Sequence, residues 1–137
     1  MAKSQRQLVQ DRAKRRCEYC QLPEDSDVQP FQMDHIRARK HAGSSNLENI
    51  AWSCLPCNSY KGPNVAGYEP ETDRLVPLFN PRNDVWSEHF AWKGARLIGL
   101  TSIGRTTISV LRINQPERVE HRRLLLALGV LQSCDPS

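Results

Sequence analysis

Two Cys-x-x-Cys pairs are the residues in this chain whose spacing most directly indicates chemistry. They are Cys17 with Cys20 and Cys54 with Cys57, and a fifth cysteine, Cys134, stands apart. A two-residue spacer lets both thiolates reach one Zn²⁺ ion, and two such pairs complete a tetrahedral site with no open position. A disulfide framework or a redox pair fits less well, because one cysteine is left over and no βαβ pattern accompanies the pairs. We therefore predict a structural zinc site and expect Cys134 to be a free thiol.

Short elements must position these cysteines. Helix-forming composition predicts a helix over residues 4–16 that runs into the first pair. Alternating side chains predict a strand at 29–36, a loop at 37–46 and a second strand at 49–53. Residues 55–61 predict a short helix, which tolerates Pro56 in its first turn and ends at Gly62-Pro63. The expected fold class is α+β, with zinc holding both ends of a strand, loop, strand and helix.

The polar residues inside this unit follow a recognisable order. Asp34-His35 ends the first predicted strand, Asn49 opens the second, and Asn58 follows Cys54 by four residues on one helix face. The stretches 33–36 (MDHI), 46–50 (NLENI) and 54–62 (CLPCNSYKG) resemble the HNH endonuclease family, the ββα-metal nucleases, over about residues 17–62. Asn58 stands where the family name has its last His, and this variant is common in the family.

The resemblance implies a metal-dependent DNA endonuclease and gives single residues their roles. His35 becomes the general base, and the ordinary pKa of histidine, near 6.5, suits the removal of a proton from water. Asn49 becomes the brace of the loop that orients His35. Asp34 and Asn58 become ligands of one catalytic ion, and their oxygen donors favour Mg²⁺ or Mn²⁺. The candidates for nucleic-acid contacts are Arg37, Arg39 and Lys61.

Positive charge is concentrated near the start of the chain. The 137 residues include 19 Lys and Arg against 15 Asp and Glu. The first 16 residues carry Lys3, Arg6, Arg12, Lys14, Arg15 and Arg16 against Asp11 alone. Concentrated positive charge favours a polyanionic partner, because each neutralised phosphate releases counterions. A solvated helix face explains the same charges, so charge alone leaves both interpretations open. With the resemblance, we predict double-stranded DNA as the partner.

Membrane and secretory segments are not evident in the sequence. The longest apolar run, residues 124–128, is far shorter than the roughly 18 residues that a membrane span requires. The first residues lack the apolar stretch of a secretory signal. We therefore predict no membrane partner and expect a cytoplasmic location.

Residues 63–137 carry weaker signals. We expect an irregular strap over 62–84, a hairpin made of 86–92 and 95–100, a helix from Thr101-Ser102 to Asn114, and a last helix at 117–128 capped by Gly129. We interpret 1–137 as a single nuclease domain, with its core at 17–62 and an extension at 63–137.

Two other classes of function compete with the nuclease interpretation. The main alternative is a non-catalytic zinc-knuckle module that only binds nucleic acid, and such a module needs neither Asp34-His35 nor Asn58. A structural zinc domain that mediates protein contacts is the second. It leaves the basic N-terminal segment unexplained and predicts no salt-dependent affinity for DNA.

Overall fold

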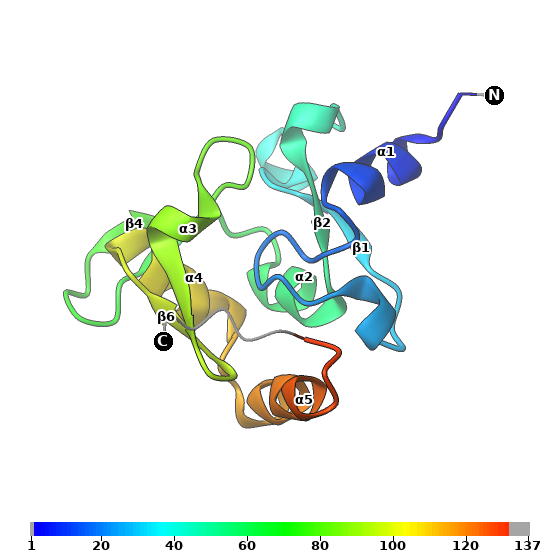
Figure 1. Ribbon diagram of the computed structural model, residues 1–137. Coiled ribbons are helices and arrows are strands. Elements are labelled where there is room, and N and C mark those ends of the chain that lie inside the picture. Colours follow the sequence, from blue (N-terminus) through cyan, green and yellow to red (C-terminus); the bar gives the residue numbers. More distant parts are fainter. Residues whose placement is uncertain (1, 132–137) are drawn as a thin grey trace.

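Short antiparallel strand pairs and helices make up the computed structural model, which describes residues 2–131 (Figure 1). The first half contains α1 (Gln5–Arg12), β1 (Gln32–His35), β2 (Ile50–Ser53) and α2 (Leu55–Lys61). The second half contains β3 (Ala66–Tyr68), β4 (Leu75–Pro77), α3 (Trp86–His89), β5 (Phe90–Lys93), β6 (Arg96–Gly99), α4 (Ser102–Leu111) and α5 (Pro116–Ala127). Single turns of 3₁₀ helix lie at Glu24–Ser26, Arg39–His41 and Leu47–Asn49. The small α+β fold expected from the sequence is confirmed.

The ββα unit predicted for residues 29–61 is present. β1 and β2 pair antiparallel, with Gln32 opposite Ser53 and His35 opposite Ile50. All four residues of β2 are buried, so one register of this pair is strongly favoured over its alternatives. The helix α2 follows at once, with Cys54 as its N-cap and Pro56 in its first turn. This order brings the end of β1 and the start of α2 into one small unit.

The N-terminal helix is shorter than the sequence predicts. It ends at Arg12 rather than Arg16, because Lys14 and Arg15 adopt left-handed backbone angles, with φ of 55° and 58°. Here the chain turns into the first cysteine knuckle, where Arg16 forms a bridge with Pro23 and the Cys17 amide donates to the carbonyl of Leu22. The contacts that form the knuckle therefore outweigh the helix propensity of residues 13–16.

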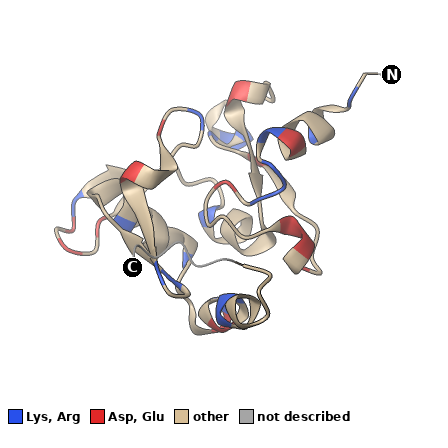
Figure 2. Ribbon diagram, viewed as in Figure 1, with Lys and Arg blue, Asp and Glu red and all other residues tan. Residues whose placement is uncertain are grey.

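Figure 2 shows where Lys and Arg lie along the ribbon, and several of the N-terminal ones form hydrogen bonds within the fold. Arg6 donates to the carbonyl of Phe31 at 2.9 Å, and its guanidinium lies 4.7 Å from the ring centre of Trp52. Arg12 donates to the carbonyls of Leu47 and Ile50. These bonds attach α1 to the residue before β1, to the turn before β2 and to the first residue of β2. The charge run therefore gives weaker support to a polyanion-binding segment than its sequence alone indicates.

The strap predicted over residues 62–84 is not irregular throughout, and this expectation is corrected. It contains the β3–β4 hairpin, with Gly67 opposite Val76. A Cβ atom at Gly67 would lie 2.5 Å from Val110 Cγ2, so the absence of a side chain lets the hairpin pack against α4. Glu69 accepts hydrogen bonds from Arg105 and from the turn amides of Glu71 and Thr72. The bond from Arg105 is the largest cause that lowers the pKa of Glu69 to about 2.

The other C-terminal elements also differ from the expectation at their ends. The predicted hairpin exists, but residues 86–89 form the helical turn α3 and the strand β5 begins at Phe90. The helix α4 stops at Leu111 because Arg112 takes a left-handed conformation, with φ of 49°. The side chain of Asn114 is thereby free to bond both the amide and the carbonyl of Leu97. The last helix, α5, runs one residue earlier than predicted, and Gly129 has the positive φ expected just after its end. Cys134 lies outside the described residues.

One hydrophobic core joins the two halves of the chain. It includes Val9 from α1, Trp52 from β2, Phe90 from β5, Leu111 from α4 and Leu125 from α5. The extension therefore packs against the ββα unit instead of forming a separate core. Across residues 2–131, no helix has the length and apolar character needed to cross a membrane.

Candidate active site and metal centre

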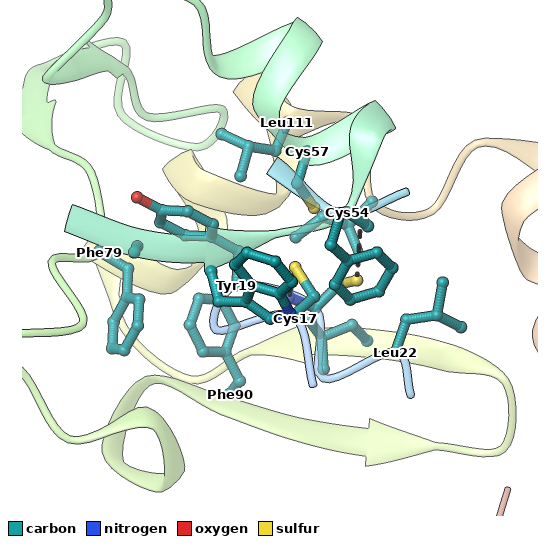
Figure 3. Close-up of a cluster of buried hydrophobic side chains, with 14 of the residues drawn as sticks. Cys17, Tyr19, Leu22, Cys54, Cys57, Phe79, Phe90 and Leu111 are labelled. Atoms are coloured by element: carbon teal, nitrogen blue, oxygen red, sulfur yellow. Dashed lines mark hydrogen bonds between the residues drawn. The ribbon is translucent and has the colours of Figure 1, made fainter. Parts of the chain in front are cut away.

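The four cysteines of the two pairs form one buried cluster. Their Sγ atoms all lie within 4.8 Å of one another, and those of Cys20 and Cys54 are 3.7 Å apart. A tetrahedral zinc site with Zn–S bonds of about 2.3 Å places its sulfurs roughly 3.8 Å apart. Figure 3 labels Cys17, Cys54 and Cys57 within the cluster of buried side chains that also contains Tyr19. The donor set and its spacing therefore fit the zinc site that the sequence predicts.

The surroundings of the thiols favour a bound cation. Burial raises the pKa of Cys57, and contact with Cys17 and the other thiols raises the pKa of Cys54. The thiols of Cys54 and Cys57 consequently resist ionisation unless positive charge lies close to them. Arg118, from α5, supplies additional positive charge, since its Nη2 lies 3.0 Å from Cys57 Sγ and 3.8 Å from Cys54 Sγ. Sequence reasoning missed Arg118, because no local pattern links it to cysteines more than sixty positions earlier.

Asp34 sits between the cysteine knuckle and α2. Its carboxylate accepts a hydrogen bond of 2.6 Å from the hydroxyl of Tyr19, one of the two residues between Cys17 and Cys20. The ammonium of Lys61 lies 3.2 Å from the same oxygen, Asp34 Oδ2, and 3.4 Å from Oδ1. Burial raises the pKa of Asp34, while Lys61 and the Tyr19 hydrogen bond oppose that rise. Tyr19 thereby links the cysteine knuckle directly to Asp34, a contact that no local pattern in the sequence indicates.

His35 ends β1 and is partly exposed. Its Nε2 lies 3.1 Å from the hydroxyl oxygen of Ser45, in the loop that connects the two strands. Its carbonyl accepts a hydrogen bond of 3.1 Å from the ammonium of Lys61. The backbone of His35 is thus held by Lys61 of α2, and its ring is held by Ser45 of the connecting loop.

Asn49 braces that loop. Its Nδ2 donates to the carbonyls of Arg37 at 3.0 Å and Ser44 at 2.7 Å, and its Oδ1 accepts from the Arg37 amide at 2.9 Å. One side chain therefore joins the first and last parts of the loop after His35. These bonds are compatible with the bracing role that the resemblance implies for Asn49.

A known protein family matches the part of the chain that holds the ββα unit, the four-thiol cluster and the residues around His35. Residues 17–64 match the family model described as HNH endonuclease. This confirms the resemblance drawn from the residues alone, and we call residues 17–64 the HNH segment. The remainder of the extension lies outside the match.

A curated relative extends the similarity beyond the HNH segment. The chain is 26% identical over 122 residues to the Septu protein PtuB of Bacillus thuringiensis. The aligned part covers 88% of this chain and 45% of that relative, so the chain spans less than half of the relative's length. No solved structure matches the chain.

The remaining predicted residues of the HNH segment fall into two groups. Arg37 and Arg39 are exposed on the connecting loop, and Asn58 is partly exposed on α2. Lys61 differs, because it is 1% exposed and its ammonium donates to the carbonyls of His35 and Ile36 as well as to Asp34. A phosphate contact by Lys61 has no support in this geometry, and the residue instead holds the end of β1 against α2.

Replacement of Tyr19 by Phe should lower the free energy of unfolding by about 1.5–3 kcal/mol, the usual effect of losing a hydrogen bond to a charged group. The ring is 0% exposed and Phe preserves it, so only the bond to the buried Asp34 is removed. Urea unfolding with zinc present measures the change. Tyr60→Phe is the matched control, because the Tyr60 hydroxyl bonds the neutral side chain of Gln115 and the residue is 37% exposed. Equal effects in the two variants would contradict the role given to Tyr19.

Proposed function

We propose that this chain is a divalent-metal-dependent endonuclease that hydrolyses phosphodiester bonds in double-stranded DNA, with His35 as the general base. The observation that carries the proposal is the placement of His35, which is partly exposed at the end of β1, beside the buried Asp34 and above the Asn49 brace. Residues 1–137 are proposed to act as a single nuclease domain, with the core at 17–62 and the extension at 63–137.

The contacts of His35 suggest which ring nitrogen takes the proton. If Nε2–H donates to Ser45 Oγ at 3.1 Å, Nδ1 carries the free lone pair and accepts the proton of the attacking water. Asn49 keeps the loop that carries Ser45 in place, since it bonds the neighbouring Ser44 carbonyl. The brace therefore acts on the base through the loop and does not touch the reacting atoms.

Two metal ions fit this chain in different ways. The four cysteines would hold Zn²⁺ as a structural ion, because the cluster is closed by four thiols. Asp34 and Asn58 would hold Mg²⁺ or Mn²⁺, and the oxygen donors fit such a hard cation. Asp34 already accepts from Tyr19 and Lys61, so an ion there would use the lone pairs that remain. When bound, this ion would neutralise charge on the phosphate and on the leaving oxygen.

The substrate must approach the face that carries the connecting loop. Arg37 and Arg39 are exposed there and are proposed to contact phosphates on either side of the scissile bond. The match to an HNH endonuclease model and the similarity to the Septu protein PtuB support a nuclease function in general. The particular substrate and chemistry are our proposal.

Incubation of the purified chain with supercoiled plasmid tests this function. We expect nicked or linear DNA with Mg²⁺ or Mn²⁺ and none after metal removal by EDTA. Zinc content is measured in parallel, and activity should return with Mg²⁺ or Mn²⁺ while the zinc stays bound. DNA binding without any product under either metal would instead favour the non-catalytic zinc-knuckle module.

A further inference from the structure

A cavity of about 530 Å³ lies between the HNH segment and the extension. The HNH side is lined by Ile36, Arg37 and Asn49, which directly follow or brace His35. The extension side is lined mainly by residues 77–80 and 83–84. Neither His35 nor Asp34 lines it, so the cavity adjoins the proposed catalytic residues without containing them. Its volume falls in the usual range for small-molecule sites, roughly 300–1,000 Å³.

The walls of the cavity divide into three chemical parts. Apolar side chains form much of the surface, and they come from both sides: Ile36, Val65, Leu78, Phe79 and Ile103. Amide and carboxylate groups stand together on one short turn, at Asn80, Asn83 and Asp84. Positively charged or ionisable groups, Arg37 and His41, line the part contributed by the connecting loop. Such a site suits a flat, mostly apolar group with hydrogen-bonding edges and an anion attached to it.

The polar turn is held rigidly. The Asn80 amide donates to Asp84 Oδ2 at 2.9 Å, and Asn80 Oδ1 accepts from the amide of Arg82 at 2.9 Å. Backbone bonds from Asn83 and Asp84 to the Asn80 carbonyl close the same turn. Among residues 2–131, the side-chain amide of Asn83 has no protein hydrogen-bond partner. The bonds within the turn thus fix its conformation, and the side chain of Asn83 remains available to a ligand.

We propose that this cavity receives one unpaired nucleobase of the DNA substrate, next to the bond that is cut. The apolar walls would cover the faces of the base, the 80–84 turn would bond its edge, and Arg37 would meet its phosphate. A bare phosphate is a poor alternative occupant, because the carboxylate of Asp84 would repel it. A base inside a regular duplex cannot reach such a pocket, so the pocket would select substrates with an extruded, bulged or mismatched nucleotide.

This inference rests on the proposed nuclease function, and a binding experiment separates the two. The His35→Ala protein is titrated with three labelled duplexes in zinc-replete buffer with Mg²⁺. One duplex is fully paired, one carries a single bulged nucleotide, and one carries the same bulge without its base. We expect the bulged duplex to bind about tenfold more tightly than the other two. The third duplex is bent in a similar way but has no base to insert, so it controls for recognition of DNA shape.

Filling the cavity should remove this preference. Val65 is 49% exposed and lines the cavity, so Val65→Phe adds a ring there at little risk to the fold. In His35→Ala protein, Val65→Phe should reduce the tenfold ratio of affinities to about one. Val28→Phe is the matched control, because it adds the same ring at a position that is 96% exposed, and it should keep the ratio. Asn83→Leu removes a polar group from the exposed turn and should also reduce the ratio of affinities. This variant replaces Val65→Phe in the experiment if the Val65→Phe protein does not fold.

Two results would overturn the inference. Equal affinities for the bulged duplex and its base-free form would exclude base insertion, even if the wild-type chain cleaves plasmid. A full preference in folded Val65→Phe protein would place the base elsewhere. Conversely, preference for the bulged base without any metal-dependent cleavage would retain the pocket and remove the nuclease proposal.

Discussion

Replacement of His35 by Ala should reduce DNA cleavage by about 10²–10⁴-fold, the usual contribution of a positioned acid–base group. The affinity for DNA should change little, because the imidazole takes a proton in the reaction and the exposed arginines of the connecting loop are the proposed phosphate contacts. Initial rates of plasmid nicking and a DNA titration, both at fixed salt, measure the two quantities.

A second histidine provides the control for this experiment. His121 lies outside the HNH segment and its Nε2 contacts the carbonyl of Ser26, so His121→Ala should leave the nicking rate near that of the wild type. A His35→Ala variant that loses DNA binding in proportion to its activity would contradict the role of general base. Such a result would point to His35 as part of the DNA-binding surface.

Replacement of Cys54 by Ser should abolish zinc binding and cooperative unfolding of the chain. The Sγ of Cys54 belongs to a cluster buried within the core, and it lies 3.7 Å from Cys20 Sγ. Structural zinc contributes about 10–16 kcal/mol of apparent binding free energy in small zinc domains. This is comparable with the ~5–15 kcal/mol by which a typical domain is stable, so the fold should fail without it.

Zinc content per chain and thermal unfolding followed by circular dichroism measure the effect. Cys134→Ser is the matched control, since Cys134 belongs to neither Cys-x-x-Cys pair and its replacement should leave the zinc content unchanged. An unchanged melting temperature and a full zinc content in Cys54→Ser would rule out the four-thiolate site.

The layout of the HNH segment can be predicted from its sequence because it depends on short spacings. A two-residue spacer sets the reach of each cysteine pair, and the alternation around Met33 and His35 indicates a strand that ends at the candidate base. The structure has this strand at Gln32–His35 and the following helix at the predicted bounds, Leu55–Lys61. Local patterns succeeded here because the zinc cluster and the strand pair leave this segment few other conformations.

Lys61 and Tyr19 show where local patterns are insufficient. Lysine at the end of a short helix is ordinarily an exposed cation, but α2 packs against β1 and the Lys61 ammonium meets the carbonyls that follow Asp34. Tyr19 lies in a knuckle between two cysteines, and only the folded chain brings its hydroxyl to a carboxylate fifteen positions later. The β3–β4 hairpin was missed for a similar reason, since its packing against α4 favours strands that its Pro- and Gly-rich sequence does not.

The sequence by itself indicated a ββα segment with two cysteine pairs, and the resemblance that these residues carry implied a base at His35 and a brace at Asn49. These features depend on residues a few positions apart, whose geometry is set by the backbone. The tertiary structure alone decided that Arg118 reaches the thiol cluster, that Arg6 and Arg12 bind backbone carbonyls, and that a cavity adjoins the candidate site. Each of these contacts depends on which distant segments the shared core brings together. That core buries side chains from both halves of the chain, so no local stretch of sequence specifies it.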